Sequence, residues 1–186
     1  MLKLRYCLKK YNITAAENRK TAFILALPLL ILPVLNLLPL FLHGFDAVQP
    51  VLMASVLLTL LWVLVEEILF RGFLPVAAME PMKFNEVQCA IAVSAVFALF
   101  HFAGIIKGAD VSYAAVQSIL AFGAGFAFTA LTFRSGSILP AAAIHFLLNL
   151  SADFCAGFSL PWLAWCGAAL LCIIYGVYLL AQKRSH

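Results

Sequence analysis

Charged side chains are scarce in this 186-residue chain, and this scarcity is the first constraint on its class. Asp, Glu, Lys and Arg make up only 11% of the residues, whereas hydrophobic residues make up 65%. A soluble domain has about 25% charged and about 45–50% apolar residues. The polar surface is too small to cover a water-soluble globule, and the apolar residues come in long runs. Both facts are explained if the chain folds in hydrocarbon.

Several motifs that would indicate other chemistry are missing. The five cysteines show no zinc-knuckle or CxxC spacing, so we expect small buried hydrophobic side chains and not a disulfide framework. There is no phosphate-binding loop and no HExxH pair. The net charge of +4 comes mostly from the N-terminal stretch and gives no nucleic-acid signal. No linker or repeat divides the chain, which favours a single domain.

What the sequence does contain is a series of apolar runs, most of them near the length of about 20 residues that a membrane-spanning helix needs. Helices are expected because backbone exposed to lipid must satisfy its own hydrogen bonds, and the alternation of a barrel is absent. The sequence therefore predicts an all-α fold, a polytopic transmembrane bundle of about six helices. The runs are Thr21–Leu42, Val48–Phe70 (continuing towards Met79 if Arg71 is paired and buried), Val87–Ile106, Tyr113–Phe133, the shorter Ile138–Phe154, and Pro161–Ala181.

The distribution of basic residues predicts the orientation of the bundle. With the N-terminus in the cytoplasm, every Lys and Arg except Lys107 falls on the cytoplasmic side. Both termini are therefore expected to be cytoplasmic. The expected organisation is a basic cytoplasmic segment at residues 1–20, one membrane-embedded domain at 21–181 and a short basic tail at 182–186.

Two acids and one arginine lie in the second apolar run, where each ionisable group costs about 2.5–3.5 kcal/mol even on lenient insertion scales. On a helix, Glu67 and Arg71 are i and i+4, so an ion pair between them is expected. That pair leaves Glu66 without a local partner, and an unpaired carboxylate in a dry site is a candidate general base. The alternative is that both acids serve a packing pair with Arg71. One acid would suffice for packing, so the doubled glutamate favours function.

Imidazole and amide side chains occur in two further runs. His101 alone is equally well explained as a hydrogen-bonded packing residue. His145 and Asn149 are i and i+4 on one helix face, and their alternative role is interhelical hydrogen bonding, worth roughly 0.6–2 kcal/mol. Three apolar helices thus supply an acid, imidazoles and an amide. These group types activate water and stabilise an oxyanion.

The ordered motifs resemble the signature of the CPBP family of intramembrane proteases, which includes the type II CAAX prenyl proteases and the bacterial Abi proteins. The resemblance covers about half of the chain and is closest to the compact bacterial members, which implies a protein of the bacterial inner membrane. The motifs are Glu66-Glu67-xxx-Arg71, Phe97-xxx-His101 and His145-xxx-Asn149.

The resemblance implies an endopeptidase that hydrolyses a peptide bond of a membrane-associated protein or peptide within the bilayer. By the family pattern, Glu66 and His101 would hold and activate the attacking water. His145 and Asn149 would stabilise the oxyanion or help to position that water. The supporting residues would be Glu67 and Arg71.

Two alternatives stay open at this level. A metal-free glutamate mechanism is favoured, but Glu66, His101 and His145 would be the ligands if a catalytic zinc were present. The chain could also be a non-catalytic bacteriocin-immunity or scaffold protein that keeps the fold. A proton-coupled carrier is disfavoured, because no inverted repeat is evident. The expected partners are a membrane-anchored protein or peptide and the lipid bilayer, without nucleic acid.

Overall fold

The fold is all-helical in the part of the chain that the computed structural model describes, which is residues 10–16, 18–44, 50–155 and 160–182. Five helical runs there are long and apolar enough to cross a membrane. The fifth predicted run forms the shorter apolar helix α9. The predicted polytopic helix bundle is therefore confirmed. The five long runs are Arg19–Asn36, Met53–Met82, Glu86–Ile106, Val111–Ser135 and Trp162–Ala181.

The first run is divided, although the sequence predicted one helix over Thr21–Leu42. Its prolines explain the division, because proline lacks the N–H of a helical hydrogen bond and its ring clashes with the preceding turn. Pro28 and Pro39 stand in the first positions of new helical segments. The segments are α2 (Arg19–Ala26), the 3-10 turn η1 (Leu27–Leu30), α3 (Ile31–Asn36) and α4 (Leu38–His43).

The second run is continuous and contains a wide turn. It consists of α5 (Met53–Glu67), the π-helix η3 (Ile68–Phe73) and α6 (Leu74–Met82). The predicted continuation beyond Phe70 is therefore confirmed, and Glu66 lies near the middle of a run of 30 residues. The π-helix lies just before Pro75, where a regular α-helix would be disrupted, and such turns occur frequently at functional sites.

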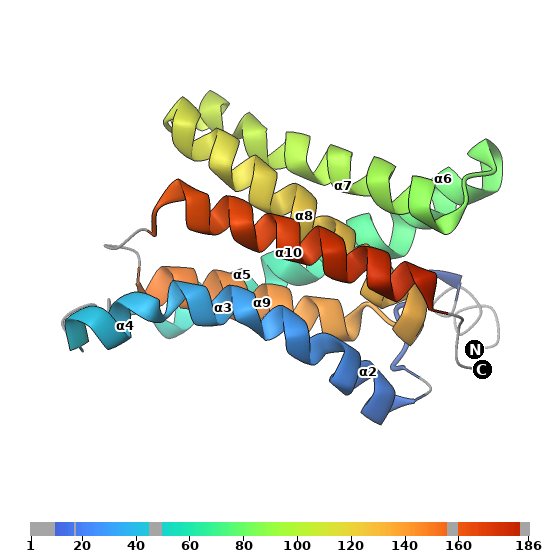
Figure 1. Cartoon of the computed structure of the whole chain (residues 1–186), viewed down its shortest axis with the longest axis horizontal. Helices are drawn as coiled ribbons and strands as arrows, with labels where there is room; N and C mark the ends of the chain where they lie inside the picture. Colours follow the sequence, from blue (N-terminus) through green and yellow to red (C-terminus); the bar gives the residue numbers. More distant parts are fainter. Residues whose placement is uncertain (1–9, 17, 45–49, 156–159, 183–186) are drawn as a thin grey trace.

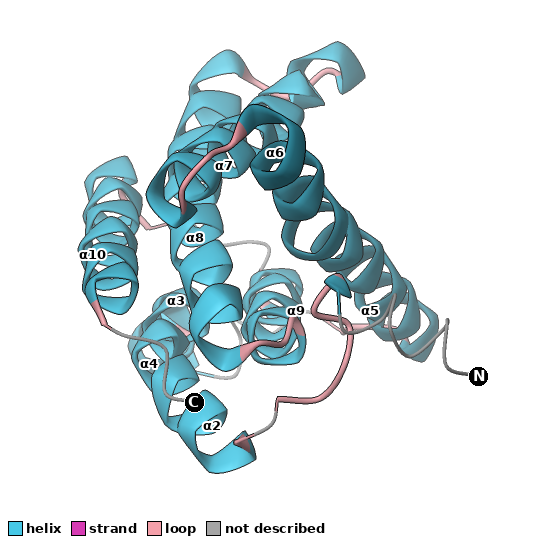
Figure 2. Cartoon of the chain, turned by 90° about the vertical axis from the view of Figure 1, so that its right-hand side faces the viewer, coloured by secondary structure: helices cyan, strands magenta, loops and turns pink. Residues whose placement is uncertain are grey.

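The centre of the bundle is α8 (Val111–Ser135), the most buried of the spanning helices. It packs against α7 (Glu86–Phe102) on one side and α10 (Trp162–Ala181) on the other, and it also contacts α9 (Leu139–Phe154). The views in Figures 1 and 2 show α8 between these helices, with α5 and α3 lying on either side of α9. A glycine makes the closest approach possible, since a Cβ at Gly123 would lie 2.5 Å from the carbonyl oxygen of Ala169.

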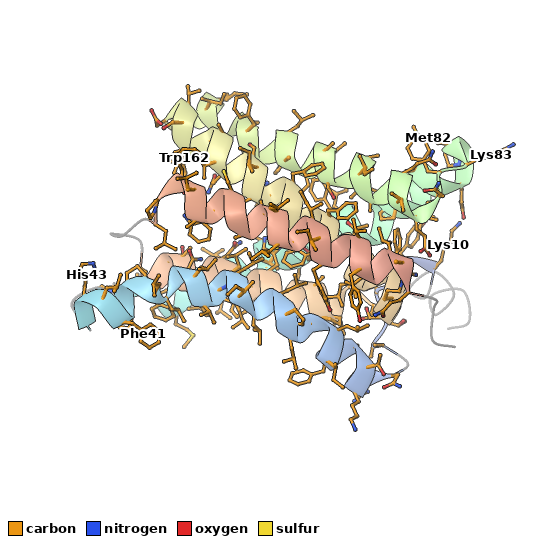
Figure 3. The ribbon with its side chains drawn as sticks, viewed as in Figure 1. Lys10, Phe41, His43, Met82, Lys83 and Trp162 are labelled. Carbon is orange, nitrogen blue, oxygen red and sulfur yellow. The ribbon has the colours of Figure 1, made fainter. Side chains whose placement is uncertain are left out.

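The two ends of the bundle differ in the residues that they carry. Lys10, Met82 and Lys83 lie at one end, called here the Met82 end, and His43 and Trp162 lie at the other, called the His43 end (Figure 3). The predicted cytoplasmic side corresponds to the Met82 end, and this orientation stays a prediction. Of the two predicted basic segments, residues 1–9 and 183–186 lie outside the described part of the chain.

Residues 10–16 lie against the Met82 end of the fold. Lys10 Nζ is 3.0 Å from a carboxylate oxygen of Glu80, and the carbonyl of Asn12 accepts a hydrogen bond from Ile138 N at 2.9 Å. The carbonyl of Tyr11 comes so close to the π-helix that a Cβ on Gly72 would lie 3.0 Å from it. This segment therefore connects the π-helix η3 with the start of α9.

Candidate active site

The predicted ion pair between Glu67 and Arg71 is present and fully buried. Arg71 Nη1 donates to Glu67 Oε1 over 2.9 Å, and both side chains are 0% exposed. The same carboxylate oxygen accepts a hydrogen bond of 2.8 Å from His145 Nδ1, which comes from α9. Glu67 is therefore held by a cation on its own helix run and by an imidazole from a neighbouring helix.

The contact with Glu67 defines how His145 presents its ring. A carboxylate at this position accepts hydrogen bonds, so Nδ1 carries a hydrogen and the other ring nitrogen points away from Glu67. That nitrogen, Nε2, lies 3.6 Å from Glu66 Oε2. This distance is too long for a direct hydrogen bond. The imidazole therefore stands between two adjacent carboxylates, bonded to one and facing the other.

Aromatic rings enclose the guanidinium of Arg71. Its central carbon lies 4.3 Å from the ring centroid of Phe97, 5.5 Å from that of Phe128 and 5.9 Å from that of Phe70. Cations are stabilised over aromatic faces, and the effect grows when water is excluded. A Cβ at Gly125 would lie 3.2 Å from Arg71 Nη2, so α8 also packs closely on this group. The site is closed on the Arg71 side.

His101 joins the cluster through Phe97. Its Nδ1 lies 3.0 Å from the carbonyl oxygen of Phe97, which can only accept, so Nδ1 carries the hydrogen and Nε2 keeps its lone pair. The ring of Phe97 lies 4.4 Å from that of His101 and 6.0 Å from that of His145, centroid to centroid. The electrostatic interaction of His101 with Glu66 and His145 places it in the same neighbourhood. The structure thus brings α7, which carries the motif Phe97-xxx-His101, to the site, and Phe97 lies close to both histidines.

Asn149 lies one turn after His145 on α9 and is half-buried. Its side chain makes no hydrogen bond to any residue that the structure describes, so its amide is available to a ligand. The sequence reasoning missed a residue that holds this part of α9. Asn36 Nδ2 donates to the carbonyl of Leu148 at 2.9 Å and lies 3.1 Å from Ser151 Oγ. The signal in the sequence that could have indicated Asn36 was its amide side chain, which is isolated in the first apolar run.

The metal alternative can be compared with the positions of the side chains. Among the described residues, no group of three or more His, Cys, Asp or Glu side chains is spaced to hold a metal ion. The trio of Glu66, His101 and His145 does not form such a group as the side chains lie. Metal independence of the site stays a prediction.

Comparison with family models identifies the chain. The model of the type II CAAX prenyl endopeptidase Rce1-like family matches residues 48–151, which is more than half of the chain. The chain therefore belongs to this family of membrane proteases, and the resemblance of its motifs to the CAAX proteases is confirmed. The matched region includes every predicted site residue. Comparisons with curated proteins and with solved structures give no significant match.

Proposed function

We propose that this chain is an intramembrane endopeptidase in which Glu66 is the general base. The observation that carries the proposal is the difference between the two adjacent acids. Glu67 uses one oxygen to bind both Arg71 and His145, whereas the carboxylate of Glu66 makes no hydrogen bond to the described residues. Glu66 is buried, with 6% of its surface exposed, and faces His145 Nε2. It is the acid that is free to take a proton.

The reaction that suits this arrangement is hydrolysis of a peptide bond by activated water. Glu66 accepts a proton from the water while the water oxygen attacks the carbonyl carbon of the peptide bond. The amide of Asn149 donates a hydrogen bond to the oxyanion that forms. The proton on Glu66 then passes to the leaving nitrogen as the C–N bond breaks, which gives a carboxylic acid and an amine.

We assign to the two histidines the binding and positioning of the attacking water. His101 Nε2 has a lone pair and can accept the second hydrogen of the water molecule. His145 is fixed by Glu67 and presents Nε2 to Glu66, so we assign it to positioning the water. Because all these groups lie in apolar helices, the substrate class is a peptide segment of a membrane-associated protein.

The test is cleavage of a library of membrane-anchored peptides by purified protein. Glu66→Gln keeps the size of the side chain and removes the base, so we expect cleavage to fall about 10²–10⁴-fold. Glu80→Gln is the matched control, because Glu80 lies on the same helical run and its side chain is 63% exposed. We expect the control to cleave at the wild-type rate, and a chelator to leave the wild-type rate unchanged.

Three results would contradict parts of this proposal. Cleavage by Glu66→Gln at the wild-type rate would show that Glu66 is not the base. Loss of wild-type cleavage with chelator, restored by added zinc, would favour the metal alternative. Failure of the wild type to cleave any peptide of the library would favour the non-catalytic immunity or scaffold function.

A further inference from the structure

A row of polar side chains leads from Glu66 along the interface of α5 and α9 towards the His43 end. On α9 the row consists of His145, Asn149 and Asp153, which are i, i+4 and i+8 and therefore share one face. His145 contacts Glu67 on α5, and Asp153 Oδ2 accepts a hydrogen bond of 3.4 Å from Thr59 Oγ1, also on α5. Asn149 lies between two residues that face α5, so it faces α5 as well.

Exposure along this polar row increases in one direction only. Glu66 and His145 retain 6% and 4% of their surface. One turn further along α9, Asn149 is half-buried, and Asp153 is exposed beside a half-buried Thr59. In the opposite direction Glu67 and Arg71 are 0% exposed. The exposed fraction of these side chains thus falls to zero towards the Met82 end and rises towards the His43 end.

The unpaired groups along the row need water. The carboxylate of Glu66, which is buried, and the amide of Asn149, which is half-buried, make no hydrogen bond to any residue in the described part of the chain. Contact of such groups with hydrocarbon alone is strongly unfavourable, because lipid offers no hydrogen-bond partner. Towards the His43 end, the row continues with the polar side chains of Asp153 and Thr59. Water is the hydrogen-bond partner that we expect for Asn149.

We propose that the polar row is the path by which the hydrolytic water reaches Glu66, entering between α5 and α9 from the His43 end past Thr59 and Asp153. The role of this water in hydrolysis rests on the proposed function. The hydration of the path and the direction in which it opens do not. With the orientation predicted from the basic residues, the water enters from the face opposite the cytoplasm. The path reaches His145, whose Nδ1 contacts Glu67, and it does not extend to Arg71, which is 0% exposed.

The experiment measures the accessibility of single cysteines to a charged, membrane-impermeant methanethiosulfonate reagent, because the reaction needs a thiolate in contact with water. The five native cysteines are first replaced, and Asn149→Cys is introduced in the full-length protein. Leu147→Cys is the matched control on the same helix, since Leu147 is apolar, 40% exposed and on a different face from Asn149. Met82→Cys marks the opposite end, where Met82 is 62% exposed. The labelling rate of Asp153→Cys measures accessibility where the path opens, and this substitution leaves the buried residues of the path unchanged.

In sealed vesicles of known orientation, we expect Asn149→Cys to react about tenfold or more faster than Leu147→Cys, because a thiol in an apolar environment is not ionised. The reaction at positions 149 and 153 should occur from the side opposite to that which labels Met82→Cys. Reaction at position 149 from the Met82 side, or at the slow rate of position 147, would overturn the proposal.

The labelling needs no substrate, so it fails independently of the proposed function. Labelling at position 149 from the His43 side, with undiminished cleavage by Glu66→Gln, would keep the water path and remove Glu66 as the base. The reverse pair of results would keep Glu66 as the base and overturn the path.

Discussion

His145 and Glu67 meet across two helices although they are 78 positions apart, with Nδ1 of the imidazole 2.8 Å from Oε1 of the carboxylate. The same oxygen binds Arg71 at 2.9 Å. A group that bonds one ring nitrogen fixes the direction of the other, so Glu67 determines where His145 Nε2 points. Glu67 thus orients the His145 ring, and its own place depends on Arg71.

Glu67→Gln should destabilise the protein far more than Glu66→Gln. Removing one partner of a buried ion pair leaves an unpaired charge and typically costs about 3–5 kcal/mol. Arg71 is 0% exposed and would be that charge, whereas Glu66 has no partner of comparable strength. Thermal unfolding in detergent, followed by loss of helical circular dichroism, measures the difference. Equal unfolding temperatures of the two variants would contradict this account of the pair.

A double variant separates stability from activity at the same site. Glu67→Gln with Arg71→Met removes both charges, so no uncompensated charge stays buried. The double variant should therefore unfold at a higher temperature than Glu67→Gln alone. Cleavage should stay low in both, because His145 has lost the carboxylate that orients it. Recovery of cleavage together with stability would show that Glu67 has only a structural role.

Asn36→Ala should weaken the hold of α3 on α9. The substitution removes the hydrogen bonds from Asn36 to the Leu148 carbonyl and Ser151 Oγ, which flank Asn149. Interhelical hydrogen bonds in membranes are worth roughly 0.6–2 kcal/mol, so the loss of stability should lie in that range. If the bonds also position Asn149, kcat should fall with KM nearly unchanged. Asn36→Asp, which cannot donate, should behave like Asn36→Ala, and wild-type kcat in both would limit Asn36 to packing.

Gly72→Ala should loosen the N-terminal segment from the π-helix. A Cβ at Gly72 would lie 3.0 Å from the Tyr11 carbonyl, which is backbone and cannot rotate away. Faster amide exchange is therefore expected over residues 10–16, and it can be measured by mass spectrometry. Gly104→Ala is the control, because the nearest atom to its Cβ would be 3.9 Å away. Unchanged exchange in Gly72→Ala would mean that the segment shifts without detaching.

The loss of stability on replacing each of three helical glycines by alanine should depend on the space around its Cβ. Gly123→Ala places a Cβ 2.5 Å from the Ala169 carbonyl oxygen, and Gly176→Ala places one 2.5 Å from the ring of Phe126. Overpacking typically costs about 1–3 kcal/mol, and the backbone clash at Gly123 should be the worse because a ring can move. Gly167→Ala meets no atom within 4 Å and should leave stability unchanged. Thermal unfolding of the three variants gives the order, and a marked loss for Gly167→Ala would contradict it.

The parts of the site that could be predicted from the sequence are those fixed by local geometry. Glu67 and Arg71 are one helical turn apart, so their pairing follows once the run is known to be helical. The shared face of His145 and Asn149 follows in the same way. The contact of His145 with Glu67 could not be derived, because it depends on how α5 and α9 pack. The positions of the apolar runs could be predicted from hydropathy, because hydropathy depends on the sequence and not on tertiary contacts.

Backbone irregularities were the other part that pattern reasoning missed. Three prolines in the first run carry the information for its division, but their apolar neighbours continue the hydropathy signal and hide the breaks. The π-helix at Ile68–Phe73 has no signal of comparable strength, because its residues are typical of any apolar helix. Pro75 lies just after this π-helix, and the structure shows that a widened turn accommodates it.

That widened turn changes the rotational phase of the helix. One additional residue in a turn rotates everything after it by about 100° relative to an uninterrupted α-helix. Before the turn, α5 directs Glu67 to α9, and after it α6 packs against α7. A single helical run can therefore serve two neighbours in different directions. Deleting one residue within 68–73 would restore a regular α-helix, and the glutamates and the α6 packing face could then no longer both reach their partners.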